Sequence, residues 1–163
     1  MTPAVLAALL AVLIAGSQWV SNPEDLGKRF ARAQGLLATA DWAGAQHSYE
    51  ALLAVPDHPL LRLSRVRVQV DEQQVGLREA ARYQLANLAR KQAQQERQEA
   101  ALAAPAAADS LEQQARTHHH QAAQRLVALR DEPGFALQDQ AGYLAMECWF
   151  EGKEYREAAR AGQ

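Results

Sequence analysis

The sequence predicts an all-α protein with an N-terminal membrane helix, and three observations lead to that prediction. Ala, Leu, Gln, Arg and Glu dominate the 163 residues, whereas Gly, Phe and Ile are scarce. The dominant side chains lose little freedom on entering a helix. The first 20 residues carry no charge, and beyond them apolar residues recur at three- and four-residue steps. We therefore expect a transmembrane anchor over residues 1–21 and a helical domain over residues 22–163.

The N-terminal segment is long enough to cross a bilayer as a single-pass anchor. Residues 3–20 form an apolar run of 18 residues, which spans about 27 Å at about 1.5 Å per residue. Lys28, Arg29 and Arg32 follow the run and no basic residue precedes it, so the positive-inside rule favours a cytoplasmic domain over a periplasmic one. The side chains expected to contact lipid, with Trp19 at the interface, are Val5, Leu6, Leu9, Leu10, Leu13, Ile14 and Trp19.

Two alternatives for this segment stay open. It could be a secretory leader that is cleaved near the small residues of "IAGSQ", which would release a soluble periplasmic chaperone or binding protein. The absence of a basic start counts against a leader. It could also be a buried helix of a soluble fold, although a run that is apolar on every side is unusual there.

Residues 22–59 predict a helical hairpin. Asn22 can cap the first helix and Pro23 suits its first position. Asp41 can cap the second helix, which Pro56 and Pro59 end. One face of each helix is apolar, comprising Leu26, Phe30, Ala33, Leu36 and Leu37 in the first and Trp42, Ala45, Tyr49, Leu52 and Leu53 in the second.

The stretch "FARAQGLLATADWAGAQHSYEALLAVPDHP" resembles a tetratricopeptide repeat. In that family an aromatic opens the second helix, a small residue follows three places on, a further aromatic comes four later, and a proline closes the unit. Trp42, Ala45, Tyr49 and Pro56 match these roles. Ala45 would let two helices cross closely, because a longer side chain would push them apart. The resemblance implies stacked hairpins with a concave face for a helix or an extended peptide.

The pattern recurs twice in weaker form. Leu77 and Ala80 lie 35 residues after Trp42 and Ala45, close to the family period of about 34 residues. Near the end a helix, Gly152, Tyr155 and Ala158 repeat the hairpin turn. The residues expected to pack the hairpins are Phe30, Leu37, Trp42, Ala45, Tyr49, Leu77, Ala80, Tyr155 and Ala158.

The segments between these repeats are also predicted to be helical. "LRLSRVRVQV" alternates like a strand, yet Leu60, Leu63, Val66 and Val70 fit a helical face and no second strand-like stretch could pair with it. Residues 77–131 predict an extended Ala/Gln-rich hairpin inserted in the middle repeat, with Pro105 as the break. Asp109 or Ser110 would cap its second helix. This composition predicts a solvated pair that buries little.

Candidate chemistry is sparse. His118, His119 and His120 are consecutive, so on a helix they point about 100° apart and cannot share one metal ion. We therefore expect an exposed polar face there rather than a metal-dependent enzyme. Cys148 is expected to be a small core residue. Without a phosphate loop, a nucleophile elbow or a paired-carboxylate motif, the sequence predicts no enzyme, no catalytic residue, no metal and no cofactor.

The expected partners are proteins and lipid. Arg62, Arg65, Arg78 and Arg82 could hold an acidic segment or lipid headgroups, or could simply form a solvated surface. The near-neutral net charge of −2 and the lack of interleaved aromatics argue against nucleic acid. The sequence thus predicts a scaffold or accessory subunit that binds other subunits of an energy-transducing, secretion or envelope complex.

Overall fold

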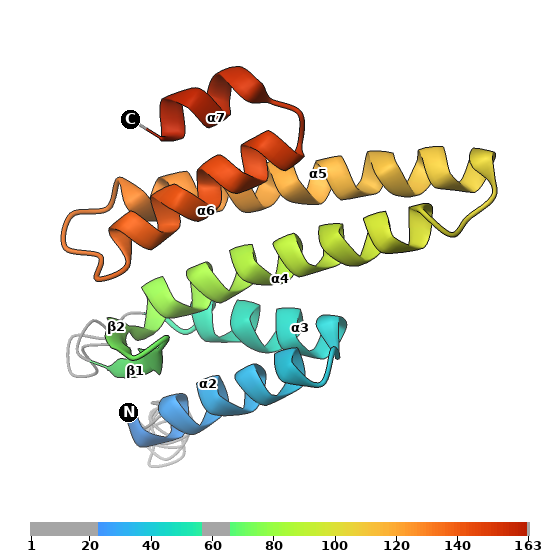
Figure 1. Ribbon diagram of the computed structural model, residues 1–163. Helices are drawn as coiled ribbons and strands as arrows, with labels where there is room; N and C mark the ends of the chain where they lie inside the picture. Colours follow the sequence, from blue (N-terminus) through green and yellow to red (C-terminus); the bar gives the residue numbers. More distant parts are fainter. Residues whose placement is uncertain (1–22, 57–65, 163) are drawn as a thin grey trace, which may run out of the picture.

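The computed structural model describes residues 23–56 and 66–162, and these are mostly helical (Figure 1). The elements are α2 (Pro23–Ala38), α3 (Trp42–Leu53), β1 (Arg67–Val70), β2 (Gln73–Gly76), α4 (Leu77–Ala100), α5 (Pro105–Arg130), α6 (Gln138–Glu151) and α7 (Tyr155–Ala161). Within the described ranges, every helix is too short or too polar to span a bilayer. The expected anchor, with Val5, Leu6, Leu9, Leu10, Leu13, Ile14 and Trp19, lies outside these ranges.

Helices α2 and α3 form the predicted N-terminal hairpin. The carboxylate of Asp41 caps α3 by accepting a hydrogen bond of 3.0 Å from the backbone N–H of Gly44. Ala45 is completely buried, which allows the close approach of the two helices. Beside it, the rings of Phe30 and Tyr49 pack with centroids 5.6 Å apart. Leu37 is buried as well, whereas Trp42 is only partly buried.

A β-hairpin follows where a helix was predicted. β1 and β2 pair in antiparallel register from Arg67 opposite Gly76 to Val70 opposite Gln73. The turn residues Asp71 and Glu72 have φ values of 44° and 66°, as expected for a two-residue hairpin loop whose twist matches the strands.

The helix prediction is therefore wrong from Val66 to Val70. The alternation was the correct signal, because Val68 and Val70 are buried whereas Arg67 and Gln69 are exposed. The partner strand β2 was not predicted from the sequence because Val75 is its only large apolar residue. Leu60 and Leu63 lie outside the described residues.

Helices α4 and α5 form a long antiparallel pair at the centre of the fold. α4 packs against α3 on one side and α5 on the other, and both helices of the pair run beyond their shorter neighbours (Figure 1). Leu77 and Ala80, at the start of α4, are buried. α5 begins at Pro105 rather than at the predicted Asp109 or Ser110, because proline suits the first helical position, where no N–H is needed.

The central pair is not the loosely solvated hairpin that its composition predicted. Alanines let the helices approach closely, so small side chains are buried completely along much of the interface. They include Ala80, Ala81, Ala86, Ala93, Ala115, Ala122 and Ala123. Side chains are mostly exposed only near the turn that connects α4 to α5, where Leu102 is 90% exposed.

Helices α6 and α7 complete the stack with a second helical hairpin. α6 packs on α5, and α7 packs on α6 (Figure 1). Cys148 and Ala158 are buried in this part of the core. Tyr155 was predicted to pack there too and does not, since it is 58% exposed. Because Tyr155 is the first residue of α7, its ring instead lies over the end of α6, with its centroid 5.5 Å from that of Phe150.

Candidate functional site

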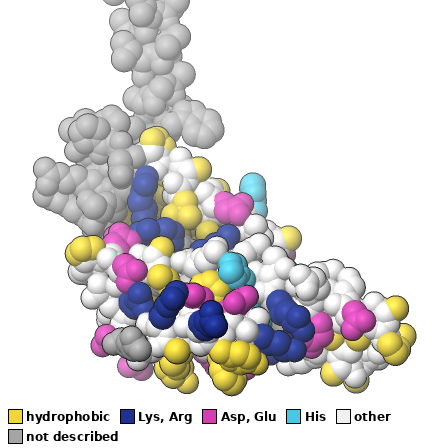
Figure 2. Space-filling view, turned by 90° about the horizontal axis from the view of Figure 1, so that it is seen from above, with side chains coloured by type: hydrophobic (Ala, Val, Ile, Leu, Met, Phe, Trp, Pro, Cys, Tyr) yellow, Lys and Arg dark blue, Asp and Glu magenta, His cyan; other side chains and the backbone are white. Residues whose placement is uncertain are grey.

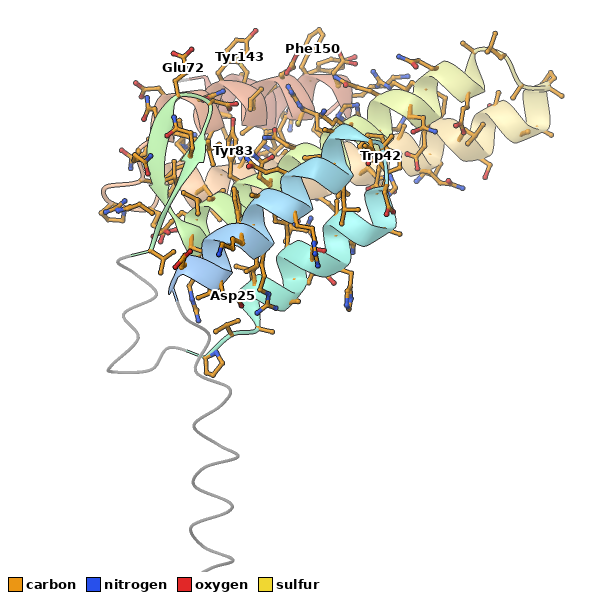
Figure 3. All side chains as sticks on the ribbon, turned by 90° about the horizontal axis from the view of Figure 1, so that it is seen from below. Asp25, Trp42, Glu72, Tyr83, Tyr143 and Phe150 are labelled. Carbon is orange, nitrogen blue, oxygen red and sulfur yellow. The ribbon has the colours of Figure 1, made fainter. Side chains whose placement is uncertain are left out.

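An exposed aromatic row lies on α6 and the start of α7. Tyr143 and Phe150 are 62% and 60% exposed, and as residues seven apart they share one helix face about 10 Å from each other along the axis. Figure 3 shows both side chains pointing away from the body of the protein, on the same side as Glu72 at the hairpin turn. Tyr155 contacts Phe150 edge to face. We call Tyr143, Phe150 and Tyr155 the α6 surface.

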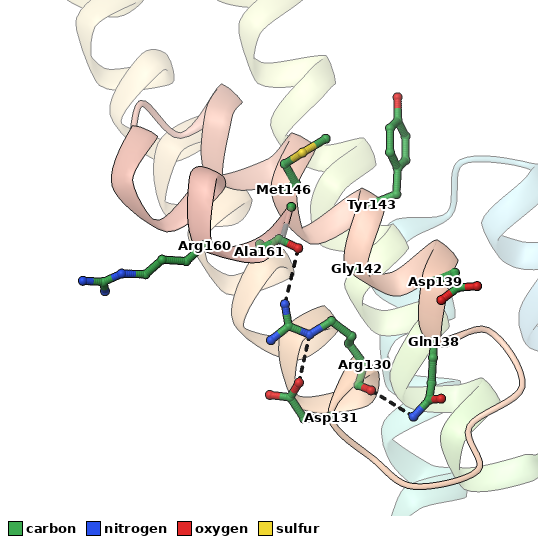
Figure 4. Close-up of a pocket in the computed structure, with 10 residues that line it drawn as sticks. Arg130, Asp131, Gln138, Asp139, Gly142, Tyr143, Met146, Arg160 and Ala161 are labelled. Atoms are coloured by element: carbon green, nitrogen blue, oxygen red, sulfur yellow. Dashed lines mark hydrogen bonds and ion pairs between the residues drawn. The ribbon is translucent and has the colours of Figure 1, made fainter.

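A hollow of about 710 Å³ borders the α6 surface on one side (Figure 4). Arg130 shapes it by donating from Nε to Asp131 at 2.8 Å and from its guanidinium to the carbonyl of Ala161 at 3.4 Å. Gly142 lets the Arg130 side chain lie close to α6, because a Cβ there would stand 3.2 Å from Cδ of Arg130. The lining comes from the end of α5, from α6 and from α7, and comprises Arg130, Asp131, Gln138, Asp139, Gly142, Tyr143, Met146, Arg160, Ala161 and Gly162.

Charges around this region are mixed in sign. Viewed from the α7 side, Lys and Arg side chains alternate with Asp and Glu, and hydrophobic side chains gather along one edge (Figure 2). Arg160 pairs with Glu157 at 2.8 Å, and exposed pairs of this kind contribute little energy. This face therefore combines exposed apolar side chains with charges of both signs rather than a field of one sign.

A second, smaller cavity of about 320 Å³ lies between α4 and α6. Two ion pairs bridge these helices. Arg90 donates to the Glu147 carboxylate at 2.7 Å, and Arg97 donates both to the carboxylate and to the backbone carbonyl of Glu151. Because Arg90 and Arg97 come from α4 while Glu147 and Glu151 come from α6, the pairs link the two helices directly. We call this space the α4–α6 cavity.

His119 contributes from α5 to the wall of the α4–α6 cavity. Its side chain is only 2% exposed, and neither ring nitrogen has a hydrogen-bond partner among the residues that the structure describes. Burial, reinforced by the positive charges of Arg97 and Arg90, lowers the pKa of His119 from 6.5 to about 4. His119 is therefore neutral at pH 7, with one ring N–H donor and one ring acceptor.

The three consecutive histidines do not form the exposed polar face that was predicted. Their directions differ by about 100° per residue, so each meets a different neighbour. His118 Nδ1 lies 2.8 Å from the Glu96 carboxylate of α4. His119 turns into the protein, and His120 is exposed with its ring edge-on to Trp149, centroids 4.7 Å apart. Only His120 fits the prediction.

Metal-binding geometry is not found among residues 23–56 and 66–162, where no three His, Cys, Asp or Glu side chains come together in a suitable group. Cys148 lines the α4–α6 cavity but is buried, and this burial raises the pKa of its thiol to about 12. It is therefore a protonated thiol at neutral pH rather than a nucleophile.

Of the four arginines expected to contact a partner, the structure describes two, Arg78 and Arg82, and these contact different segments. Arg62 and Arg65 lie outside the described residues. Arg78 donates to the carbonyl of Val55 at 2.6 Å, just after α3, whereas Arg82 pairs with Glu132 in the loop after α5. Both thus brace α4 against neighbouring segments.

Sequence reasoning did not identify the α6 surface. Tyr143 and Phe150 stand seven residues apart in a nearly continuous apolar stretch, "GYLAMECWF", in which exposed and buried faces look alike. The seven-residue spacing, which places Tyr143 and Phe150 on one face of a helix, was the signal that could have identified this surface.

Comparisons with protein-family models, curated proteins and solved structures found no match to this chain.

Proposed function

We propose that this protein is a membrane-attached helical scaffold or accessory subunit that binds another subunit of a membrane complex through the α6 surface. The observation that carries the proposal is the row of Tyr143, Phe150 and Tyr155, all more than half exposed beside a hollow of about 710 Å³. Aromatic side chains offer a large contact area and lose little rotamer freedom on binding, and they are frequent among the residues that dominate binding energy.

The occupant that best fits this surface is an amphipathic helix of the partner. Tyr143 and Phe150 repeat after two helical turns, which suits apolar anchors at positions i, i+3, i+4 and i+7 of a facing helix. The hollow beside Tyr143 would accept one anchor, and polar groups such as Asp139 and Arg160 at its rim would satisfy polar positions next to the anchor. The mixed charges favour recognition by shape and apolar contact.

The uncharged N-terminal run supports the membrane attachment. Because α2 begins at Pro23, directly after that run, an anchored protein would hold its helical domain close to the bilayer. Lys28, Arg29 and Arg32 favour the cytoplasmic side for this domain. The alternative of an exported periplasmic binding protein makes a distinct prediction, since its mature N-terminus would lack roughly the leader length of 15–30 residues.

A tetratricopeptide-like organisation remains part of the proposal. The pairs α2–α3 and α6–α7 are helical hairpins, each with a buried small residue, Ala45 and Ala158, on its second helix. The middle unit departs from the pattern. A tetratricopeptide repeat would place a first helix directly before the helix that begins at Leu77, whereas here the β-hairpin precedes it. The repeat likeness therefore rests on the two ends of the described domain.

Site-specific photo-crosslinking in native membranes tests the proposal. A benzophenone amino acid replaces Tyr143 or, as a control, Leu102, which is 90% exposed at the far tip of the α4–α5 pair. We expect one discrete crosslinked protein from position 143 and none from position 102. Crosslinking from 102 alone, or only to lipid from 143, would overturn the assignment of the α6 surface. N-terminal sequencing of the membrane-extracted protein decides between the anchored and the exported form.

A further inference from the structure

A third hollow lies between the first half of α5 and the turn that joins α6 to α7. Its volume is about 600 Å³. Five polar side chains of α5, among them Arg116, line one side, and Gly152, Lys153 and Glu154 of the turn line the other. We call this space the turn hollow. Its lining contains two cationic groups, one acid and no large apolar side chain, so it suits a polar ligand rather than an apolar anchor.

The two cations of the turn hollow, Arg116 and Lys153, form no ion pair with any residue in the described ranges. The other two hollows differ in this respect. In the hollow beside the α6 surface and in the α4–α6 cavity, every arginine of the lining is paired with a carboxylate. The turn hollow therefore keeps its positive charge available for a group from outside.

Both cations can be reached from solvent. Lys153 is exposed, and Arg116 is half-buried. The Nε atom of Arg116 is buried, whereas its terminal nitrogens are neither buried nor hydrogen-bonded to a described residue. Partial burial of the Arg116 side chain restricts its rotamers before any ligand arrives, so less conformational entropy is lost on binding.

The backbone at Lys153 favours glycine rather than lysine. Its φ value is 66°, in the left-handed region that glycine usually occupies after a helix. The turn is closed by two hydrogen bonds, from the N–H of Lys153 to the carbonyl of Phe150 at 3.0 Å and from the N–H of Glu154 to the carbonyl of Trp149 at 2.8 Å. A lysine in this conformation is unfavourable for folding, and the side chain that it adds lines the hollow. This combination indicates a role in binding.

We propose that the turn hollow binds the phosphate monoester group of a small soluble molecule. Such a group carries a charge of about −1.5 to −2 at pH 7 and three acceptor oxygens, which matches two unpaired cations. The guanidinium fork of Arg116 suits two oxygens, and the ammonium of Lys153 suits the third as a point charge. The side-chain amides of Gln113 and Gln121, which also line the hollow, each supply further N–H donors. This proposal does not depend on the α6 surface.

Other ligand classes fit less well. A carboxylate has one charge and two oxygens, so Arg116 alone would satisfy it and Lys153 would remain unpaired. A metal ion would meet two cations and a single carboxylate, that of Glu154. No Phe, Tyr or Trp lines the hollow for stacking with nucleic-acid bases.

The position of the turn hollow favours a soluble source of the phosphate over a lipid headgroup. The hollow adjoins the start of α7, and α7 and α2 lie at opposite ends of the helical stack (Figure 1). The proposed membrane attachment precedes α2, so it would hold the other end of the stack at the bilayer.

Nuclear magnetic resonance of the ¹⁵N-labelled full-length protein in phosphatidylcholine micelles tests this site at pH 7 and constant ionic strength. The probes are glycerol 3-phosphate, inorganic phosphate, acetate, and phosphatidate added to the micelles. We expect saturable shifts of the Lys153 and Glu154 amides with both soluble phosphates, and binding at least about tenfold weaker for acetate, because a charged hydrogen bond is worth about that factor. Equal affinity for acetate, or shifts that never saturate, would overturn the proposal. A response to phosphatidate alone would overturn the soluble source.

Matched variants locate the binding. Lys153→Gly removes one cation and places glycine at the positive φ, so the melting temperature should be kept or raised while phosphate affinity falls at least about tenfold. Arg156→Ala is the control, because Arg156 is an exposed cation of α7 that does not line the hollow. Unchanged affinity in Lys153→Gly, or an equal loss in both variants, would refute the site.

A third variant tests the sign of the electrostatic effect. Glu154→Gln removes the one acid from the lining, and the Glu154 side chain makes no capping hydrogen bond at the start of α7, so folding should be retained. Phosphate affinity should rise about two- to fivefold, as expected for one exposed charge. Unchanged or weaker binding in Glu154→Gln would contradict a ligand with negative charge at this place.

Discussion

The buried His119 predicts a specific loss of stability in acid. The pKa of this histidine is about 4 in the folded protein, against 6.5 for an ordinary histidine. Above pH 6.5 both the folded and the unfolded chain hold it neutral, so it contributes no pH dependence. As the pH falls from 6.5 to 4, the unfolded chain takes up a proton that the folded chain does not, and the unfolded state is favoured.

The size of this effect follows from the difference between the two pKa values. At about 1.4 kcal/mol per pKa unit, the full penalty is about 3 kcal/mol and is reached below pH 4. His119→Gln keeps a polar side chain of similar length but cannot titrate, so this part of the acid sensitivity should disappear. Carboxylates also titrate in this range, and comparison between variants removes their contribution because it is common to both.

Thermal unfolding of the full-length protein in mild detergent, followed by circular dichroism between pH 7 and pH 4, measures the effect. The unmodified protein should lose melting temperature more steeply than His119→Gln. His120→Gln, at an exposed histidine beside Trp149, is the control for replacing a neighbouring histidine by glutamine. Identical slopes for the unmodified protein and His119→Gln would refute the buried, neutral state of this histidine.

Three further substitutions or reagents test the packing. Ala45→Leu should destabilise the protein by about 1–3 kcal/mol, because Ala45 is completely buried where α2 and α3 cross; an unchanged melting temperature would contradict that packing. Asp41→Ala removes the cap on the Gly44 N–H and should cost about 1 kcal/mol in the free energy of unfolding, whereas the exposed Glu50→Ala should cost less than about 0.5 kcal/mol. Cys148, buried and with its pKa raised to about 12, should resist iodoacetamide at pH 8 until the protein is unfolded in urea; rapid labelling of the folded protein would contradict its burial.

The helices were predictable from sequence because their apolar spacing is strong. Leu26, Phe30, Ala33 and Leu37 recur at three- and four-residue steps and share the buried face of α2. Asp41 and Gly152 also marked real boundaries, the start of α3 and the end of α6. The β-hairpin was missed because strand pairing is a relation between two segments, and the second, Gln73–Gly76, carries almost no apolar signal of its own.

The candidate sites were harder to predict because both depend on tertiary placement. His119 looks the same as His118 and His120 in sequence, and only the positions of α4 and α6 decide that it alone is buried. The α4–α6 cavity likewise depends on Arg90 and Arg97 meeting glutamates more than 50 residues away. Tyr155 shows the opposite error: the sequence predicted that it packs inside the hairpin, and the structure leaves it exposed.

Quantitative recovery of partner proteins from detergent-solubilised membranes tests the central claim most directly. The tagged full-length protein is compared with the double variant Tyr143→Ala/Phe150→Ala and with Leu102→Ala. Since all three positions are more than half exposed, each variant should retain its melting temperature within the small range typical of surface changes. We predict that the double variant recovers at least tenfold less of a specific partner while Leu102→Ala recovers it fully. Undiminished recovery with the double variant would contradict the assignment of the α6 surface as the binding face.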